Sequence, residues 1–473
     1  MPRMSGLLDI IGSHPASRPA LEGMGMLLGY GELCEQVKRK ADSLRGLHAR
    51  TGGVMAITMI DSPAWIVTQL GCLLAEVPLL PIPPFFTEAQ RRHALQDAGA
   101  AWLLDDGQAA PVATGISPRP FPAGTSLITY TSGSTRTPKG VCLGADHLET
   151  VASSLVELLG AQAGKHRTLL PLAVLLENIA GVHVSLLAGA CCHVAPVAQD
   201  GPSIWQALES SQATTCILVP EMLKRLLSVR KPLPHLRFAA VGGAKVAPAL
   251  LEEAHARGIP VFEGYGLSEA GSVIAVNTPE ASRRGSVGRL LPHVRLHPAS
   301  DGEIMIEHPR MLGYLGAEGS GEAGCVPNPY PTGDLGRIDG DGFLYLTGRA
   351  KNVLITGFGR NVFPEWVESE LLAEPAIAQA MVFGDGEAAL MAVIVARSAA
   401  EAGRAVEQAN LRLPDYARVG RWLLADEPFT PQNGQLTGTG RPKRDAIAAR
   451  YQSRFPNEAK LTNETGDRRH GVL

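Results

Sequence analysis

The sequence of 473 residues has no excess of either charge and no long unbroken apolar run. Its 43 Lys and Arg residues nearly balance 46 Asp and Glu residues, for a formal net charge of −3. A general nucleic-acid binder needs surplus cations to displace counterions, so the balance argues against that class. Glu177 and Asn178 interrupt the most apolar stretch, 169–197. Because a bilayer span needs about 20 largely unbroken apolar residues, we expect a buried helix and strand there, and no integral membrane segment.

Cysteine pairs with metal-binding spacing are also missing. The seven cysteines are odd in number and include no C-x-x-C. We therefore expect neither a zinc site nor a disulfide framework, and a reducing compartment is the simplest interpretation. The N-terminal segment lacks an apolar core followed by a small-residue cleavage site, so we expect no signal peptide and a cytoplasmic location. An apolar fraction of 45% excludes a disordered chain.

Apolar runs of strand length alternate with helical patterns in the first hundred residues. The runs at 54–60, 77–82 and 101–104 predict strands. Helical spacing at 65–74 and a Thr-capped segment at 87–99 predict helices. This alternation favours a mostly parallel sheet that is buried on both faces.

The pattern changes twice further along the chain. The α/β alternation returns between about 150 and 279, and Gly- and Asp-punctuated segments after 279 predict antiparallel strands. After Arg349, a helix at 365–372 and strands at 377–383 and 389–395 are expected. The predicted fold is α/β. A large domain, residues 1–348, is expected to contain layered α/β subdomains and a small β-rich portion. A small mobile α+β domain, residues 349–473, follows it. The chain from residue 456 is polar and is expected to fray.

The segment around residues 130–140 is dense in hydroxyl groups. They belong to Thr131, Ser132, Ser134, Thr135 and Thr137. A polyphosphate needs many short hydrogen-bond donors and one mobile cation, which Lys139 supplies, and Gly133 lets the backbone approach closely. This is not the Walker pattern, because no glycine precedes the lysine. Composition alone favours a solvated Ser/Thr-rich turn, but the order of the residues favours a phosphate loop.

Residues 131–140 resemble the phosphate loop of the AMP-forming adenylating enzymes, the superfamily of acyl-CoA synthetases, peptide-synthetase adenylation domains and luciferases. Three further segments are similar to motifs of this superfamily, in the expected order. The segment 263–269 (EGYGLSE) resembles its adenine and magnesium motif, and 330–334 (YPTGD) its ribose-binding motif. The segment 348–368 resembles its hinge and the entry to its small domain. The resemblance spans about residues 20 to 450 and is strongest to the fatty acid–CoA ligase branch.

The resemblance implies an ATP-dependent reaction in two steps. A carboxylic acid joins AMP with release of pyrophosphate, and the acyl group then passes to a thiol. The implied cofactors are ATP, Mg²⁺ and coenzyme A, or the phosphopantetheine of a separate acyl carrier protein. Aliphatic residues at 171–178 replace the aromatic–His pair of the acyl-gate motif. A fatty or other apolar acid is therefore expected, because burial stabilises each CH₂ by about 0.8 kcal/mol.

The resemblance also assigns roles to residues. The implied catalytic residues are Lys139, Glu269, Lys351, Arg441 and Lys443. The implied nucleotide-binding residues are Thr131, Ser132, Gly133, Ser134, Thr135, Gly243, Ala244, Glu263, Gly264, Tyr265, Gly266, Leu267, Ser268, Asp334 and Arg349. Thr131 and Glu269 are the implied magnesium ligands. The plain alternatives are a solvated Glu269, a core Tyr265 and a turn residue at Asp334.

The C-terminal part departs from the family pattern. Lys351 matches the hinge position, but the usual adenylation lysine has no direct counterpart. When the basic residues at the end of segment 433–444 are aligned with the family pattern, Arg441 takes the position of that lysine, and Lys443 follows two residues later. Arginine would bind a carboxylate or phosphate through a bidentate fork. The alternative is that Arg441, Lys443 and Arg444 merely coat a solvated helix start.

Two other classes of protein are alternatives to a ligase, a serine hydrolase and a non-catalytic ligand-binding protein. Residues 266–270 nearly match the G-x-S-x-G elbow of a serine hydrolase, but Ala270 replaces the last glycine and the next residues, 272–276, predict a strand where a helix is required. The altered basic segment motivates a non-catalytic ligand-binding relative. Release of pyrophosphate from ATP separates the ligase from both.

Overall fold

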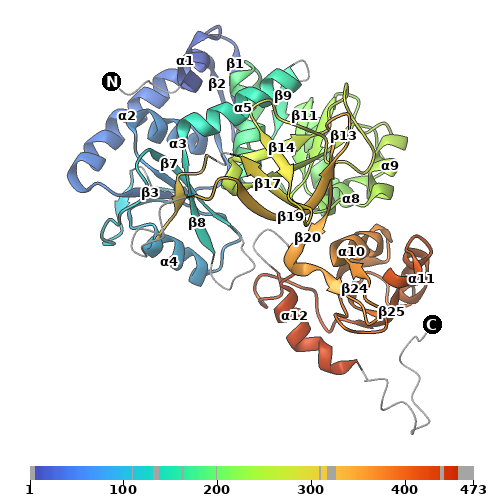
Figure 1. Ribbon diagram of the computed structural model, residues 1–473. Helices are drawn as coiled ribbons and strands as arrows, with labels where there is room; N and C mark the ends of the chain where they lie inside the picture. Colours follow the sequence, from blue (N-terminus) through green and yellow to red (C-terminus); the bar gives the residue numbers. More distant parts are fainter. Residues whose placement is uncertain are drawn as a thin grey trace.

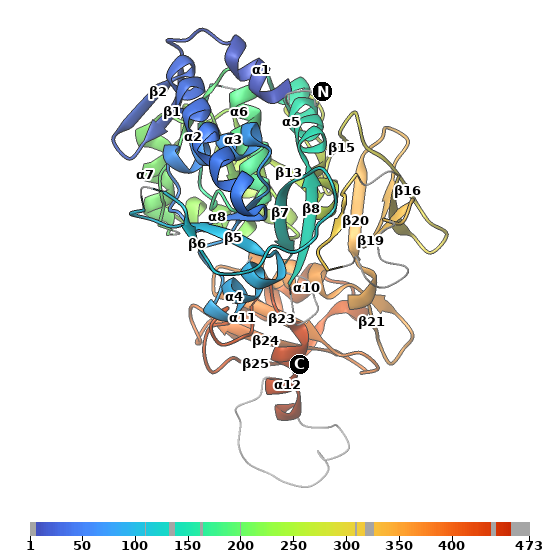
Figure 2. The ribbon, with the colours of Figure 1, turned by 90° about the vertical axis from the view of Figure 1, so that its left-hand side faces the viewer.

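The computed structural model describes residues 6–108, 110–131, 138–160, 164–198, 200–307, 310–316, 326–436 and 441–455. A large N-terminal α/β part and a small C-terminal part make up the fold, and two perpendicular views place the small part, in orange and red, below the large one (Figures 1 and 2). Ser132, Gly133, Ser134, Thr135 and the expected fraying end lie outside the described residues.

The first hundred or so residues supply three adjacent strands of a seven-stranded sheet of order β18-β8-β7-β4-β3-β5-β6. Its strands are β3 (Val54–Ile57), β4 (Leu79–Pro81), β5 (Ala100–Leu104), β6 (Val112–Ala113), β7 (Thr125–Thr131), β8 (Lys139–Gly144) and β18 (Gly313–Tyr314). The strands β5, β3, β4 and β7 pair in parallel, which confirms the predicted alternation. The edge strands pair antiparallel.

A second sheet has nine strands in the order β15-β14-β13-β12-β11-β9-β10-β1-β2. The strands are β1 (Pro19–Gly23), β2 (Met26–Gly29), β9 (Lys165–Arg167), β10 (Cys191–His193), β11 (Thr215–Leu218), β12 (Phe238–Val241), β13 (Val261–Leu267), β14 (Ser272–Val276) and β15 (Arg289–Leu290). From β1 to β13 the neighbours pair in parallel, so the carboxyl ends of these strands share one edge. Bound ligands favour this edge in α/β sheets.

Helices cover these sheets. They are α1 (Gly6–Ser13), α2 (Tyr30–Thr51), α3 (Pro63–Ala75), α4 (Glu88–Asp97), α5 (Ala145–Leu159), α6 (Val184–Leu187), α7 (Gly201–Ser211), α8 (Pro220–Ser228) and α9 (Pro248–Ala256). Their starts follow the expected cap chemistry. The Ser62 hydroxyl accepts from the Trp65 amide before α3, and Thr87 forms a capping box with Gln90 before α4.

The most apolar stretch folds as expected into a helix and a strand. Residues Glu177–His183 form a π-helix, which runs into α6, and β10 follows. The π-turn hydrogen bonding was not predicted, because apolar spacing does not distinguish it from an α-helix. Among the described residues, no helix is both long and apolar enough to cross a membrane.

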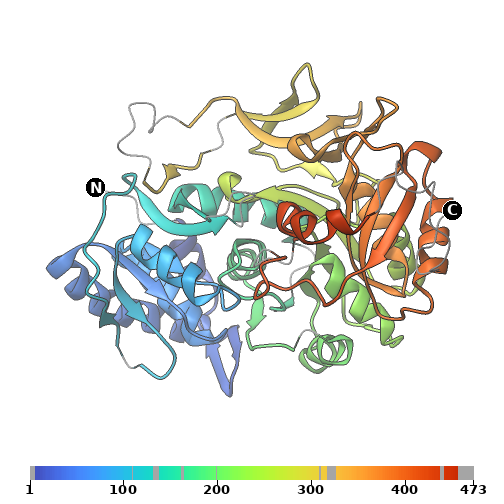
Figure 3. The same ribbon diagram turned by 90° about the horizontal axis from the view of Figure 1, so that it is seen from below.

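The C-terminal third contains the antiparallel strands and the small domain. A four-stranded sheet contains β16 (Arg295–Pro298), β17 (Glu303–Glu307), β19 (Tyr330–Ile338) and β20 (Leu344–Arg349). The small domain contains a hairpin of β21 (Leu354–Ile355) and β22 (Asn361–Val362), a sheet of β23 (Ile377–Phe383), β24 (Leu390–Ala396) and β25 (Val419–Leu424), and the helices α10 (Pro364–Ala373), α11 (Ala402–Leu411) and α12 (Arg444–Tyr451). Helix α10 and strands β23 and β24 confirm the helix and two strands expected after Arg349. Seen from below, the red C-terminal segments lie in front of the green and yellow strands (Figure 3).

Candidate active site

The residues predicted to bind a nucleotide come from several strands of the large domain and from the segments that follow them. Thr131 ends β7, Asp334 lies on β19, and Arg349 ends β20. Gly243 and Ala244 follow β12, and Gly243 has a φ of 82° that suits glycine. All five line one cavity of about 2890 Å³ between the large and small domains. The cavity lining also includes Glu263, Gly264, Tyr265, Gly266, Leu267, Ser268 and Glu269.

A buried carboxylate stands at the centre of this group. Asp334 is only 6% exposed, and its Oδ1 lies 2.7 Å from Nε of Arg349. The Tyr265 hydroxyl donates to Oδ2 over 2.5 Å. Burial raises the pKa of Asp334, while the charge of Arg349 opposes the rise. Asp334 lies within strand β19, so it is not the turn residue of the plain alternative. Its carboxylate has further lone pairs that can accept hydrogen bonds from a vicinal diol.

Glu269 is held by a tyrosine that the sequence analysis missed. It lies in the 3₁₀-helix η3 (Ser268–Ala270), and its Oε1 accepts a hydrogen bond of 2.9 Å from the Tyr314 hydroxyl. The hydroxyls of Tyr314 and Tyr330 are 2.9 Å apart. The ammonium of Lys139 lies 5.5 Å from the centre of the Tyr314 ring. Tyr314 therefore links the candidate metal ligand to the candidate phosphate-binding lysine.

The donor set fits a magnesium ion that arrives with a nucleotide. Glu269 and the Thr131 hydroxyl are hard oxygen donors on the same cavity. Among the described residues, no group of three His, Cys, Asp or Glu side chains is arranged to hold a metal ion. Mg²⁺ is usually bound through one or two carboxylates together with substrate phosphates and water. A single glutamate near a phosphate site is therefore sufficient.

The two described ends of the predicted phosphate loop lie opposite each other. Thr131 pairs with Lys139 in the register of β7 and β8. The Lys139 side chain is exposed there. Of these two residues, Thr131 lines the cavity.

Glu263 is a buried carboxyl group among the predicted nucleotide-binding residues. It lies on β13 and is 9% exposed. Burial raises its pKa to about 7, although a hydrogen bond from the backbone of Val246 and the charge of Lys245 both lower it. Glu263 is thus poised to change its protonation near neutral pH.

Basic residues of the small domain reach the nucleotide-binding residues. Nε and Nη2 of Arg441 donate to the Gly243 carbonyl over 3.0 and 2.6 Å. Lys443 caps α12 and lines the same cavity. Lys351 lies in the short helix η4 (Ala350–Asn352) and also lines the cavity. Burial, followed by the charge of Arg349, lowers the pKa of Lys351.

The idea that these cations only coat a helix start is wrong for Arg444. Helix α12 does begin at Arg444, but the side chain forms an ion pair with Glu368 of α10. Nη2 lies 2.6 Å from Oε2 and Nη1 lies 2.8 Å from Oε1. Glu368 is buried, so the pair fixes the start of α12 against α10. Arg441 lies three residues before this anchor.

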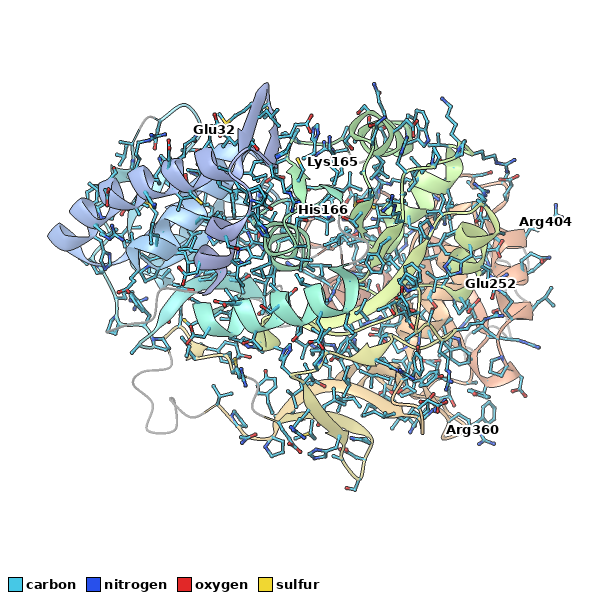
Figure 4. All side chains as sticks on the ribbon, turned by 90° about the horizontal axis from the view of Figure 1, so that it is seen from above. Glu32, Lys165, His166, Glu252, Arg360 and Arg404 are labelled. Carbon is cyan, nitrogen blue, oxygen red and sulfur yellow. The ribbon has the colours of Figure 1, made fainter. Side chains whose placement is uncertain are left out.

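The expected aliphatic gate lines another part of the cavity. Its lining residues include Ala173, Val174, Leu175, Leu176, Ala180 and Val184. His166 is also among the lining residues, and its Nε2 lies 2.7 Å from Oε1 of the buried Glu177. Oε2 of Glu177 accepts from the Leu170 amide over 3.0 Å. Figure 4 shows His166 inside the molecule, whereas Arg360 and Arg404 lie at its edge. From the sequence, Glu177 was expected only to interrupt an apolar run and to lie in the gate segment 171–178, without a role of its own.

The serine hydrolase alternative does not fit this geometry. Ser268 opens a three-residue 3₁₀-helix between β13 and β14, which pair antiparallel. A nucleophile elbow requires a sharp turn from a strand into a helix that packs on the sheet. The position of Ser268 is that of a tight connection in a hairpin.

Comparison with known proteins identifies the family. The AMP-binding enzyme family matches residues 10–118 and 105–315, and the AMP-binding enzyme C-terminal domain matches residues 351–456. The chain belongs to the AMP-binding enzyme family. This AMP-binding enzyme therefore shares the fold and the enzymatic class of the AMP-forming adenylating superfamily.

Curated relatives of this AMP-binding enzyme include several CoA ligases. The 2-succinylbenzoate–CoA ligase of Bacillus subtilis (strain 168) is 27% identical, over 84% of this chain and 89% of the relative. The indoleacetate–CoA ligase of Aromatoleum aromaticum is also 27% identical, over 89% and 92%. The long-chain-fatty-acid–CoA ligase FadD15 of Mycobacterium bovis is 31% identical, over 46% of this chain and 41% of that protein.

Solved structures of one relative also match closely. They are O-succinylbenzoate CoA synthetase (MenE) from Bacillus subtilis with the acyl-adenylate intermediate OSB-AMP, and the same protein with ATP and a magnesium ion. Both are 26% identical to this AMP-binding enzyme, with TM-scores of 0.78 and 0.76. The matches cover 93% of this chain and 97% and 98% of theirs.

Proposed function

We propose that this AMP-binding enzyme is an acid–CoA ligase for an apolar carboxylic acid. The acid's carboxylate attacks the α-phosphorus of ATP, and pyrophosphate leaves. The thiol of coenzyme A then attacks the acyl carbonyl of the acyl-AMP, AMP leaves, and the thiol proton passes to solvent. The relatives that are CoA ligases support both steps, and the relative solved with ATP and a magnesium ion supports the cofactors.

One observation carries the proposal for the first step. The double hydrogen bond from Arg441 to the Gly243 carbonyl brings a cation of the small domain onto the residues around Asp334 and Tyr265. Charge develops on the α-phosphate in this reaction, and a preorganised cation aimed there lowers the barrier. In this proposal Arg441 or Lys443 neutralises that charge. Glu269 would hold Mg²⁺, which would supply charge to screen the phosphates, and Asp334 would bind the ribose.

The cavity then has two ends. We call the part around Gly243, Tyr265, Asp334 and Arg349 the nucleotide end. The acyl end is the part lined by residues 173–176, Ala180 and Val184. Aliphatic side chains at the acyl end suit a hydrocarbon, and a fatty acid is the substrate that its chemistry favours. The matched ligases that act on succinylbenzoate and indoleacetate favour a second candidate, an apolar acid that carries an aromatic ring.

A panel of acids tests this proposal. The purified protein is mixed with ATP, Mg²⁺ and saturated fatty, benzoic or arylalkanoic acids, with and without coenzyme A. We expect pyrophosphate release with at least one apolar acid, and an acyl-CoA product by mass spectrometry. Arg441→Ala and Lys443→Ala, tested separately by pyrophosphate exchange, show which cation acts. If no acid supports pyrophosphate release, the proposed function is wrong.

The thiol acceptor is tested separately. Coenzyme A is the acceptor named for the matched ligases, while the family resemblance also allows a separate acyl carrier protein. Turnover with free coenzyme A is compared with turnover on a holo carrier protein. Faster transfer to the carrier would replace coenzyme A in the proposal and leave the first step unchanged.

We further propose a domain boundary at 348/349 with a hinge near Lys351. Lys351 lies two residues after the end of β20, in the short helix η4, where a small change of backbone angles would swing the small domain. Lys351→Pro should spare acyl-AMP formation and depress thioester formation. Equal loss of both half-reactions would contradict the hinge.

A further inference from the structure

A single lysine of the large domain binds the end of a small-domain helix. Lys224, on α8, donates from Nζ to the backbone carbonyls of Leu372, Glu374 and Ile377. The last two hydrogen bonds are 2.8 and 2.9 Å long. All three protons of the ammonium group are therefore used across the domain interface.

These acceptors lie where a cation is most favourable. Helix α10 ends at Ala373, so Leu372 and Glu374 belong to its last turn and its cap. The last carbonyls of a helix have no partner within the helix and carry the negative end of its dipole. Ala373 also packs against the apolar core around α8 and β11. Lys224 thus caps α10 from the opposite domain.

A second contact lies beside the first. Nη2 of Arg397, in the small domain, is 2.9 Å from Oε1 of Glu221 on α8. Both side chains are more than a third exposed, so solvent screens this ion pair. The lysine contact is the more buried of the two, and burial lowers the pKa of Lys224 to about 8. The free-energy cost of desolvating the ammonium group offsets part of the free energy gained from its hydrogen bonds. The net contact is therefore weak enough to open.

Helix α10 connects this contact to the active-site loop. Glu368, one turn before the end of α10, holds Arg444 through two hydrogen bonds. Arg444 starts α12 directly after the segment that carries Arg441 and Lys443. The same small-domain position that lets Lys224 cap α10 therefore also brings Arg441 onto the Gly243 carbonyl.

We propose that Lys224 is a positioning residue, which docks the small domain onto α8 in the orientation for acyl-AMP formation. The inference rests on the proposed function, because it assumes two half-reactions that need different orientations of the small domain. Lys224 touches no reacting group in it and acts through α10, Glu368 and Arg444. Opening of the Lys224 contact then frees the small domain for the thiol step.

The test separates the two half-reactions. Lys224→Met removes the ammonium and keeps the length of the side chain, and Lys231→Met is the matched control, since Lys231 is an exposed lysine stacked on Trp205. We expect Lys224→Met to slow pyrophosphate exchange about tenfold through the loss of charge-assisted hydrogen bonds. Thioester formation from supplied acyl-AMP should stay within about twofold of wild type. The control should change neither rate.

A second variant guards against misfolding, and scattering tests the domain position without any turnover. Arg397→Gln should slow pyrophosphate exchange about twofold in the same direction, because it removes a solvent-screened ion pair and two long hydrogen bonds to the Pro375 and Ile377 carbonyls. Small-angle X-ray scattering with ATP and Mg²⁺ should show a broader range of domain positions for Lys224→Met than for wild type. Equal slowing of both half-reactions, or unchanged scattering, would overturn the role of Lys224. Absence of pyrophosphate release by the wild type would instead overturn the proposed function.

Discussion

The nucleotide end and the acyl end of the cavity use polar groups in opposite ways. At the nucleotide end, Tyr265, Asp334 and Arg349 bond to one another and still face the cavity. At the acyl end, the Glu177 carboxylate accepts from the Leu170 amide and bonds to His166, and of these two side chains His166 alone is among the lining residues of the cavity. The first arrangement presents hydrogen-bond acceptors and donors to a ligand. The second satisfies the buried carboxylate of Glu177 with protein partners and does not present that carboxylate to the ligand.

This difference follows from what each end must bind in the proposed function. A nucleotide has fixed polar groups, so its partners need defined positions on strand ends. A hydrocarbon needs volume and apolar surface, which many combinations of side chains supply. We therefore expect changes at the nucleotide end to abolish turnover with every acid, and changes at the acyl end to alter which acid is used.

The largest effect is expected for Asp334→Ala. The change removes the ribose acceptor and leaves the Tyr265 hydroxyl and the Arg349 guanidinium without their carboxylate. Loss of a hydrogen bond to a charged group costs about 1.5–3 kcal/mol, so pyrophosphate exchange should fall by about 10- to 150-fold. Asp341→Ala is the control, because Asp341 forms an exposed pair with Arg283. Equal effects of both variants would contradict the assignment of Asp334.

Gly181→Ala should next destabilise the acyl end. A Cβ atom at this position would lie 2.5 Å from Oε1 of Glu177 and 2.6 Å from Nε2 of His166. Overpacking of this kind costs about 1–3 kcal/mol, which a urea denaturation curve measures. Gly12→Ala is the control, since a Cβ there meets nothing within 4 Å. An unchanged midpoint for Gly181→Ala would mean that the buried pair can move.

The sequence carried more information about the nucleotide end than about the acyl end. Strand and helix periodicity predicted β3, α3 and α4 closely, and the motif around Tyr265 marked a hairpin that does line the cavity. Tyr314 left no such signal, because it reaches Glu269 only through the pairing of β18 with β8, far apart in the chain. Such a contact depends on tertiary pairing and not on local spacing.

The acyl end was predictable only as apolar. A change from α- to π-type hydrogen bonding does not show in a pattern of apolar residues, so the inward position of Glu177 was not foreseen. The interdomain contact of Lys224 was missed for a related reason. An isolated lysine on an amphipathic helix resembles any solvated lysine until the partner carbonyls of the other domain are known.

Glu263→Gln should make the free energy of unfolding depend less on pH. Burial raises the pKa of this carboxyl group in the folded protein to about 7, whereas the pKa of an unperturbed glutamate is 4.5. The folded state therefore binds more protons between these values, and wild-type stability falls as the pH rises through them. We expect the variant to be more stable by about 3 kcal/mol at pH 8 and nearly equal to wild type near pH 4.5.

Glu252→Gln is the matched control for this measurement. Glu252 is an exposed glutamate that lies at the surface in Figure 4 and pairs with Arg284. Its replacement should leave the pH dependence as in wild type. If Glu263→Gln is less stable than wild type at pH 8, the carboxylate must be ionised and bound in the folded protein.

The smallest effect is expected for Ala180→Leu at the acyl end. Ala180 lines the cavity on the π-helix, so a larger side chain there shortens the space for the acid. Each CH₂ of substrate that is excluded loses about 0.8 kcal/mol, or about fourfold in kcat/KM. A series of acids of increasing length measures the loss, and the KM for ATP should not change. A uniform loss with all acids, or a raised KM for ATP, would show that the two ends of the cavity are not independent, and the comparison between them would fail.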